Sequence, residues 1–155
     1  MKALTIYMPL VLLSLAACNG NKSTSQQAND TLDVSLNECY VAVFEKDTAH
    51  LNLSALEGSK IKGNLLIQYH NNPKNEGELT GRRIGDTLFA DYSYTVGTYE
   101  KVVNKNPLAF LVKGDSLILG VGEIETKMGR SYFKPGVPIH FDKGRFRFTK
   151  GECKN

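Results

Sequence analysis

Carboxylates and histidines are the side chains of this sequence that could do acid–base chemistry or hold a metal ion. Asp91 and Glu123 fall in different strand-like runs, and two carboxylates across the mouth of a barrel could act as acid and base. His50, His70 and His140 lie on three separate runs, whereas a zinc site needs three or four converging ligands. Because strands commonly keep one face in water, all five are more simply explained as exposed polar residues. We therefore expect no catalytic residue, no metal site and no cofactor.

Three tyrosines define a second kind of candidate site. Tyr69, Tyr92 and Tyr94 could line a pocket together with Asp91 and Glu123, and could hydrogen-bond a ligand there. They could equally be core residues whose hydroxyl groups reach water. Small barrels either hold one small ligand or are filled by their own side chains, so both interpretations stay open.

The elements that carry these residues are expected to be short strands. Between positions 87 and 95, the side chains of Leu88, Ala90, Tyr92 and Tyr94 fall on one face of an extended chain. Segment 71–77 reads as a long loop, and segment 98–103 fits a short helix and an extended arm equally well. The other expected strands are 40–44, 50–55, 60–70, 78–84, 108–113, 117–125, 130–134, 138–142 and 145–149.

About nine short strands with tight connections and almost no helix predict an all-β domain. We expect an antiparallel meander that closes, or nearly closes, into a small barrel, because closure removes the exposed edges of a sheet. Such a barrel resembles the lipocalin and other calycin barrels in general shape. A two-sheet β-sandwich is the alternative.

The first 18 residues follow a targeting pattern. Lys2 gives a positive start, the run 6–17 is almost wholly apolar, and the segment ends Leu15-Ala16-Ala17-Cys18. The run is too short to span a bilayer but has the length of a secretory signal. It resembles a bacterial lipoprotein signal peptide with its lipobox. The resemblance implies cleavage after residue 17, a lipid on Cys18 and a membrane attachment through that lipid. An ordinary signal peptide that releases a soluble periplasmic protein is the alternative.

The resemblance also bears on location and on the segment that follows. Asn19 replaces the Asp that often retains such lipoproteins in the inner membrane, which favours the outer membrane, facing the periplasm or the cell surface. Residues 18–36 are rich in Asn, Ser, Thr and Gln and are expected to form a flexible, lipidated tether. Residues 37–155 then form a single β domain.

Two further cysteines remain once Cys18 carries the lipid. Cys39 opens the first strand-like run and Cys153 follows the last. Disulfides persist in exported proteins, so we expect these two to form a bridge that ties the ends of the fold together. Free thiols are the alternative, and no short ligand spacing favours a metal.

Charge is distributed unevenly along the chain. Residues 18–125 contain 10 Lys and Arg against 14 Asp and Glu, a balance of −4, and residues 126–155 contain 8 against 2, a balance of +6. The basic part could meet anionic lipid or an acidic partner, or could form the solvated faces of strands. We expect no nucleic-acid partner.

A second resemblance covers most of the expected domain. The sequence is similar to a group of small uncharacterised bacterial lipoproteins with a Cys-Tyr opening, a Gly-Asp-x-Leu turn, an Asp-Tyr strand, a Gly-x-Gly-Glu segment and a Cys near the C-terminus. The resemblance implies architecture and no mechanism. The matching residues are Cys39-Tyr40, Gly85-Asp86-Thr87-Leu88, Asp91-Tyr92, Gly114-Asp115-Ser116-Leu117, Gly120-Val121-Gly122-Glu123 and Cys153.

Three classes of function are compatible with these features. The first is a non-catalytic binding module that holds a small apolar ligand, as a lipocalin-like carrier does, or meets another envelope protein. The second is an inhibitor of a cell-wall-degrading enzyme such as lysozyme, suggested by the small disulfide-closed shape alone. The third, an enzyme, would require Asp91, Glu123 and the histidines to share one concavity. We rank them in that order.

Overall fold

The computed structural model describes residues 37–153, and their ordered elements are ten strands. Within this range there is no apolar helix of membrane-spanning length. The expected signal peptide (1–17), the lipid-attachment residue Cys18 and the expected tether (18–36) lie outside the described residues.

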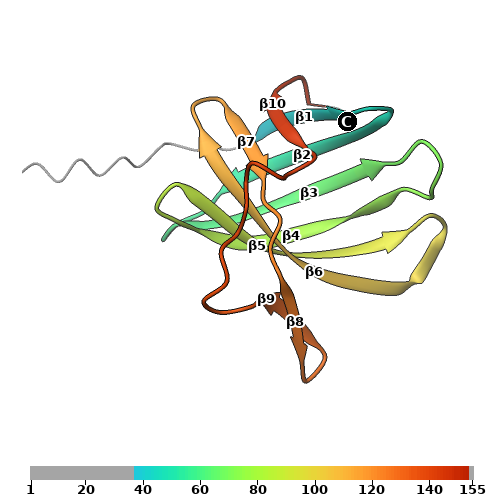
Figure 1. The fold of residues 1–155 in the computed structure, drawn as a ribbon. Coiled ribbons are helices and arrows are strands. Elements are labelled where there is room, and N and C mark those ends of the chain that lie inside the picture. The colour runs from blue at the N-terminus through green and yellow to red at the C-terminus, as the bar shows by residue number, and fades with distance from the viewer. Residues whose placement is uncertain (1–36, 154–155) are drawn as a thin grey trace, which may run out of the picture. The chain divides into compact units, whose positions relative to one another are not determined.

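Eight of the strands form a closed antiparallel barrel (Figure 1). Each strand pairs with the next along the chain from the first to the seventh, and the last strand closes the ring by pairing with both the seventh and the first. The predicted meander barrel is therefore confirmed, and the sandwich alternative is wrong. The barrel strands are β1 (Glu38–Phe44), β2 (Asp47–Ala55), β3 (Lys60–Gln68), β4 (Asn75–Ile84), β5 (Thr87–Val96), β6 (Tyr99–Lys113), β7 (Ser116–Leu119) and β10 (Arg147–Lys150).

The core fills the barrel with the side chains that the alternation predicted to face inward. Phe110 and Phe148 are fully buried and meet edge to face, with ring centroids 5.8 Å apart. Burying a large apolar side chain stabilises a fold by about 1.5–3 kcal/mol, so this set dominates the stability of the barrel. The fully buried leucines around the two rings are Leu51, Leu53, Leu65, Leu79 and Leu88.

Strand β4 approaches β5 closely at glycines on its inner face. A Cβ atom placed on Gly81 would lie 1.9 Å from the backbone oxygen of Phe89 on β5. Only glycine permits this close approach, and tight coiling of the strands is what lets a small sheet close on itself.

The region after β7 differs from the prediction of one strand at 117–125. β7 ends at Leu119, and the chain leaves the barrel to form the separate hairpin of β8 (Ile124–Lys127) and β9 (Arg130–Phe133), which points away from it (Figure 1). A Cβ on Gly120 would lie 2.5 Å from Ile139, so the bend is held by side chains packed on a bare backbone. The expected strand 138–142 is also wrong, because it forms only the isolated bridge between Val121 and His140.

The structure also changes other predicted strand boundaries. Within segment 98–103, residues 99–103 belong to the long strand β6, where Tyr99 pairs with Val96, so the extended alternative is correct and the helical one is wrong. β4 begins at Asn75, which shortens the expected loop at 71–77. β10 begins at Arg147 rather than at position 145.

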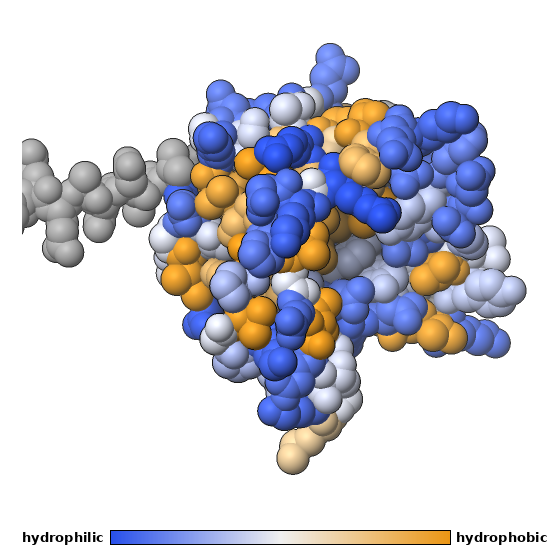
Figure 2. Space-filling model, viewed as in Figure 1, coloured by the Kyte–Doolittle hydropathy of each residue, from blue (hydrophilic) through white to orange (hydrophobic). Residues whose placement is uncertain are grey.

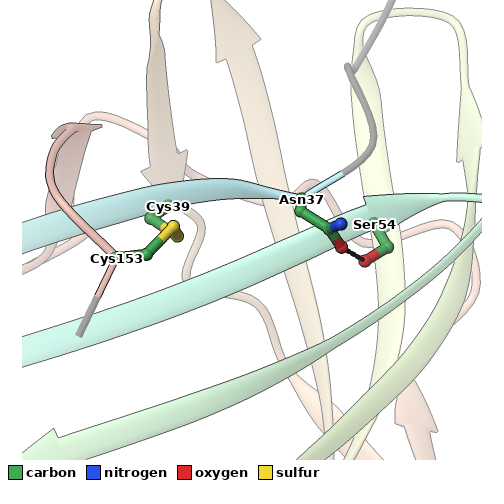
Figure 3. Close-up of a disulfide and its surroundings, with 4 residues drawn as sticks. All are labelled: Asn37, Cys39, Ser54 and Cys153. Carbon is green, nitrogen blue, oxygen red and sulfur yellow. Dashed lines mark hydrogen bonds between the residues drawn. A yellow bond between two sulfur atoms is a disulfide. The ribbon is translucent and has the colours of Figure 1, made fainter. Parts of the chain in front are cut away.

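A disulfide joins Cys39 of β1 to Cys153 after β10, as predicted, with Cα atoms 5.1 Å apart (Figure 3). Nearby, the Ser54 hydroxyl donates to Asn37 Oδ1 at 2.8 Å. We call this side of the barrel, with the turns at 56–59, 85–86 and 114–115, the disulfide end. The opposite side, with the turns at 45–46 and 97–98 and the loop 69–74, is the mouth end. The two sets of turns lie to the left and right in Figure 1.

Candidate binding mouth of the barrel

The barrel wall is incomplete at the mouth end because two of its strands are short. β7 pairs with β6 only from Phe110 to Lys113, and β10 pairs with β1 only at Tyr40 and Val41. Within residues 37–153, the part of β6 nearest the mouth therefore has no strand beside it on this side. Figure 2 shows this face hollowed near its centre, with apolar side chains deep inside. The gap gives access to the inner faces of the neighbouring strands.

The three predicted tyrosines come together at the mouth end. Tyr92 and Tyr94 follow one another on the inner face of β5, and their rings stack with centroids 4.6 Å apart and planes 13° apart. Tyr69, directly after β3, and Tyr94 are partly buried and pack on the core, whereas Tyr92 is fully inside it. The cluster therefore runs from the core to the surface.

A glycine allows the backbone of β4 to lie close to β5 beside Tyr94. Gly77 of β4 stands opposite Tyr94 in the register, and a Cβ there would lie 2.5 Å from the Tyr94 Cα. The His70 N–H donates to Asp47 Oδ1 at 2.9 Å, which ties the loop after Tyr69 to the start of β2. Two mouth loops are thus fixed to each other next to the rings.

Burial favours the protonated form of two tyrosines of the cluster. Removal from water raises the pKa of Tyr92 and of Tyr69, and the neighbouring tyrosines add to the rise in both. Both hydroxyls are therefore neutral at physiological pH, where a phenol can both donate and accept a hydrogen bond. The Tyr92 hydroxyl already donates to the Leu65 carbonyl at 2.9 Å, while the Tyr94 hydroxyl accepts from Asn106 Nδ2 at 3.3 Å.

The rim adds residues that the sequence analysis did not name as site residues. Phe44 and Phe146 meet edge to face with centroids 6.4 Å apart, and the Arg145 guanidinium lies 5.6 Å from the Phe44 ring centroid. Phe146 is buried in the core, and Phe44 is partly buried and packs against it. Phe44 is thus the aromatic side chain of this pair that reaches the mouth end.

Asp91 and Glu123 do not join the mouth. Asp91 lies between Ala90 and Tyr92 on β5 and faces outward. Its carboxylate is 3.0 Å from Arg130 Nη2. Glu123 precedes β8 and pairs with Lys134 Nζ at 3.2 Å. Both carboxylates are largely exposed and ion-paired, so the structure removes the geometry that an acid–base pair across the mouth would require.

The histidines are also separate. His50 is on β2, His70 is in the loop after β3, and His140 belongs to the bridge with Val121. In the part of the chain that the structure describes, no group of three or more His, Cys, Asp or Glu residues converges as a metal site would.

The mouth is suited to noncovalent binding. Its floor offers stacked aromatic faces, its polar groups are neutral hydroxyls, and one guanidinium stands on the rim. Ligand sites typically combine apolar and aromatic lining with a few placed polar groups, which is this composition. No protein-family model, curated protein or solved structure gives a significant match to this chain.

Proposed function

We propose that this chain is a lipid-anchored protein of the bacterial envelope whose barrel is a non-catalytic binding module. The mouth end takes a small, largely apolar ligand, which the tyrosine cluster stacks against and hydrogen-bonds. A partner protein of the envelope that inserts an apolar side chain would use the same surface.

The observation that carries this proposal is the half-buried tyrosine cluster at a gap in the wall. Tyr69 and Tyr94 are only partly buried beside the core. Full burial of both rings would stabilise the fold more, so their partial exposure is better explained by binding than by a purely structural role. An aromatic floor next to an opening is a common form of ligand site in small barrels.

The position of Asn37 supports an anchored role. Asn37, the first described residue, lies at the disulfide end, and the mouth is at the other end of the barrel. A tether that continues from Asn37 to a lipid on Cys18 would leave the mouth free for a ligand. Two or more acyl chains on one residue would hold the protein stably on a membrane.

Binding is tested on the mature chain with Cys18→Ser, which removes the lipid and its micelle. We expect the neutral apolar dye N-phenyl-1-naphthylamine to brighten on binding, and Tyr94→Ser to weaken its affinity at least about tenfold through loss of the stacked ring. Tyr99→Ser is the matched control, because Tyr99 is exposed on β6 at the same end. Equal affinities for the two variants, with both folded by circular dichroism, would refute the mouth as the site.

Anchoring is tested separately in the expressing bacterium. We expect radiolabelled palmitate to appear on the protein and to sediment with the outer membrane, and Cys18→Ser to abolish both. Label that persists on the Cys18→Ser variant, or is absent from the parent, would contradict the anchor.

A further inference from the structure

A second groove lies on the outside of the barrel. Strand β9 of the hairpin lies against β6, where Pro107 and Ala109 are buried, and an open groove of about 710 Å³ lies between the hairpin and strands β4 and β5. We call it the hairpin groove, and its principal lining residues are Lys60, Arg82, Ile84, Phe89, Asp91 and Phe133. Its volume falls in the range of small-molecule sites. The mouth tyrosines are not part of it.

The groove has apolar side chains on the outer face of the barrel, where polar side chains are usual. Phe89 is partly buried on the outside of β5, Ile84 is 51% exposed on the outside of β4, and Phe133 comes from the hairpin. The outer face of an antiparallel sheet usually meets water through polar side chains. A contiguous apolar surface rimmed by charged residues marks a binding site more often than chance exposure does.

The charged rim is strongly one-sided. Lys60 and Arg82 stand directly opposite each other in the β3–β4 register, both exposed, and neither forms an ion pair with an acidic residue within the described range. Like charges placed opposite each other destabilise a sheet. Asp91, the acid of this groove, is already paired with Arg130 at 3.0 Å. An anion between Lys60 and Arg82 would relieve their repulsion.

The geometry points to a site for a small amphiphilic carboxylate, an alkyl chain with a single carboxylate head. The head lies between Lys60 and Arg82, where the guanidinium can give two parallel hydrogen bonds to its two oxygens. The chain lies along Phe89 and Ile84 toward Phe133. This site is distinct from the mouth, because none of the mouth tyrosines lines the hairpin groove.

The test measures dodecanoate binding to the mature Cys18→Ser chain by calorimetry, below the micelle concentration of the ligand. We expect Lys60→Gln/Arg82→Gln to weaken binding at least about tenfold, since it removes both charge-assisted contacts. The matched control is Lys113→Gln/Arg147→Gln, which removes the same charge from exposed positions on β6 and β10. We expect the control and Tyr94→Ser to bind as the parent does.

Ligand controls separate the contributions of head and chain. We expect dodecyltrimethylammonium, with the same chain and the opposite charge, and acetate, with the head alone, each to bind at least about tenfold more weakly than dodecanoate. Equal binding of the cationic detergent, or an equal loss in the matched control, would overturn the site. A loss in Tyr94→Ser with none in Lys60→Gln/Arg82→Gln would place dodecanoate in the mouth and equally overturn it.

Discussion

The two ends of the barrel differ in how they are closed. At the disulfide end all eight strands are present, and Lys150 Nζ lies 2.7 Å from Glu38 and 3.2 Å from Asp115, while Tyr40 donates to Glu38. At the mouth end β7 and β10 are missing from the wall, and aromatic side chains meet solvent. The disulfide end is thus closed by covalent and polar contacts, whereas the mouth end presents partly exposed aromatic side chains.

Removal of the disulfide is expected to have the largest effect on the difference in stability between the two ends. Cys39→Ser/Cys153→Ser releases a bridge across a sequence separation of 114 residues, and we expect the free energy of unfolding to fall by about 2–5 kcal/mol. Urea denaturation measures the loss. Dye binding at the mouth should persist at low temperature, because the bridge lies at the other end. An unchanged free energy of unfolding would show that the disulfide end does not depend on its bridge.

Alkaline pH should weaken the fold through two buried tyrosines. Burial raises the pKa of Tyr40 and of Tyr92, and the acceptor Glu38 adds to the rise for Tyr40. In the unfolded chain both ionise near pH 10, so the unfolded state loses these protons first as the pH rises. Their stabilising effect is complete below about pH 10 and falls above it.

Urea denaturation between pH 8 and pH 11.5 measures this slope. We expect Tyr40→Phe/Tyr92→Phe to flatten it, and Tyr99→Phe, at an exposed position, to leave it unchanged. A parent whose stability is constant through this range would contradict the burial argument.

The smallest expected effect is the difference in stability between phenylalanine variants of two tyrosines of the cluster, Tyr92 and Tyr94. Tyr92→Phe removes a buried hydrogen bond to the Leu65 carbonyl and should lower the free energy of unfolding by about 0.5–1.5 kcal/mol. Tyr94→Phe loses an exposed contact with Asn106 and should leave stability nearly unchanged. Equal losses in the free energy of unfolding would show that the Tyr94 hydroxyl contributes as much to stability as the buried Tyr92 hydroxyl does.

Alternation in the sequence was enough to predict the faces of the barrel strands. Leu88, Ala90, Tyr92 and Tyr94 do face inward, and the same pattern places Asp91 outside, so its absence from the mouth follows from the period alone. The pairing of Cys39 with Cys153 was predicted from the two cysteines left over in an exported chain, and closure of the barrel brings them together.

Strand ends could not be predicted in the same way. The period-two pattern at 138–142 is real, since Ile139 and Phe141 pack against Gly120, but an alternating pattern reports which side is covered and not whether the backbone is paired. The mouth depends on where β7 and β10 stop, and that depends on packing around Gly120. The hairpin groove depends on the same departure of the chain from the barrel.

Closure of the ring has a consequence for the order of folding. Strands β2 to β6 each pair with a neighbour in sequence, but Tyr40 of β1 pairs with Lys150 of β10, which lies almost at the other end of the chain. Contacts that join distant parts of a chain form slowly, because a long loop must be restricted before they contribute. During synthesis the meander can form while the ring stays open, and the ring is completed only once β10, the last barrel strand along the chain, has been made.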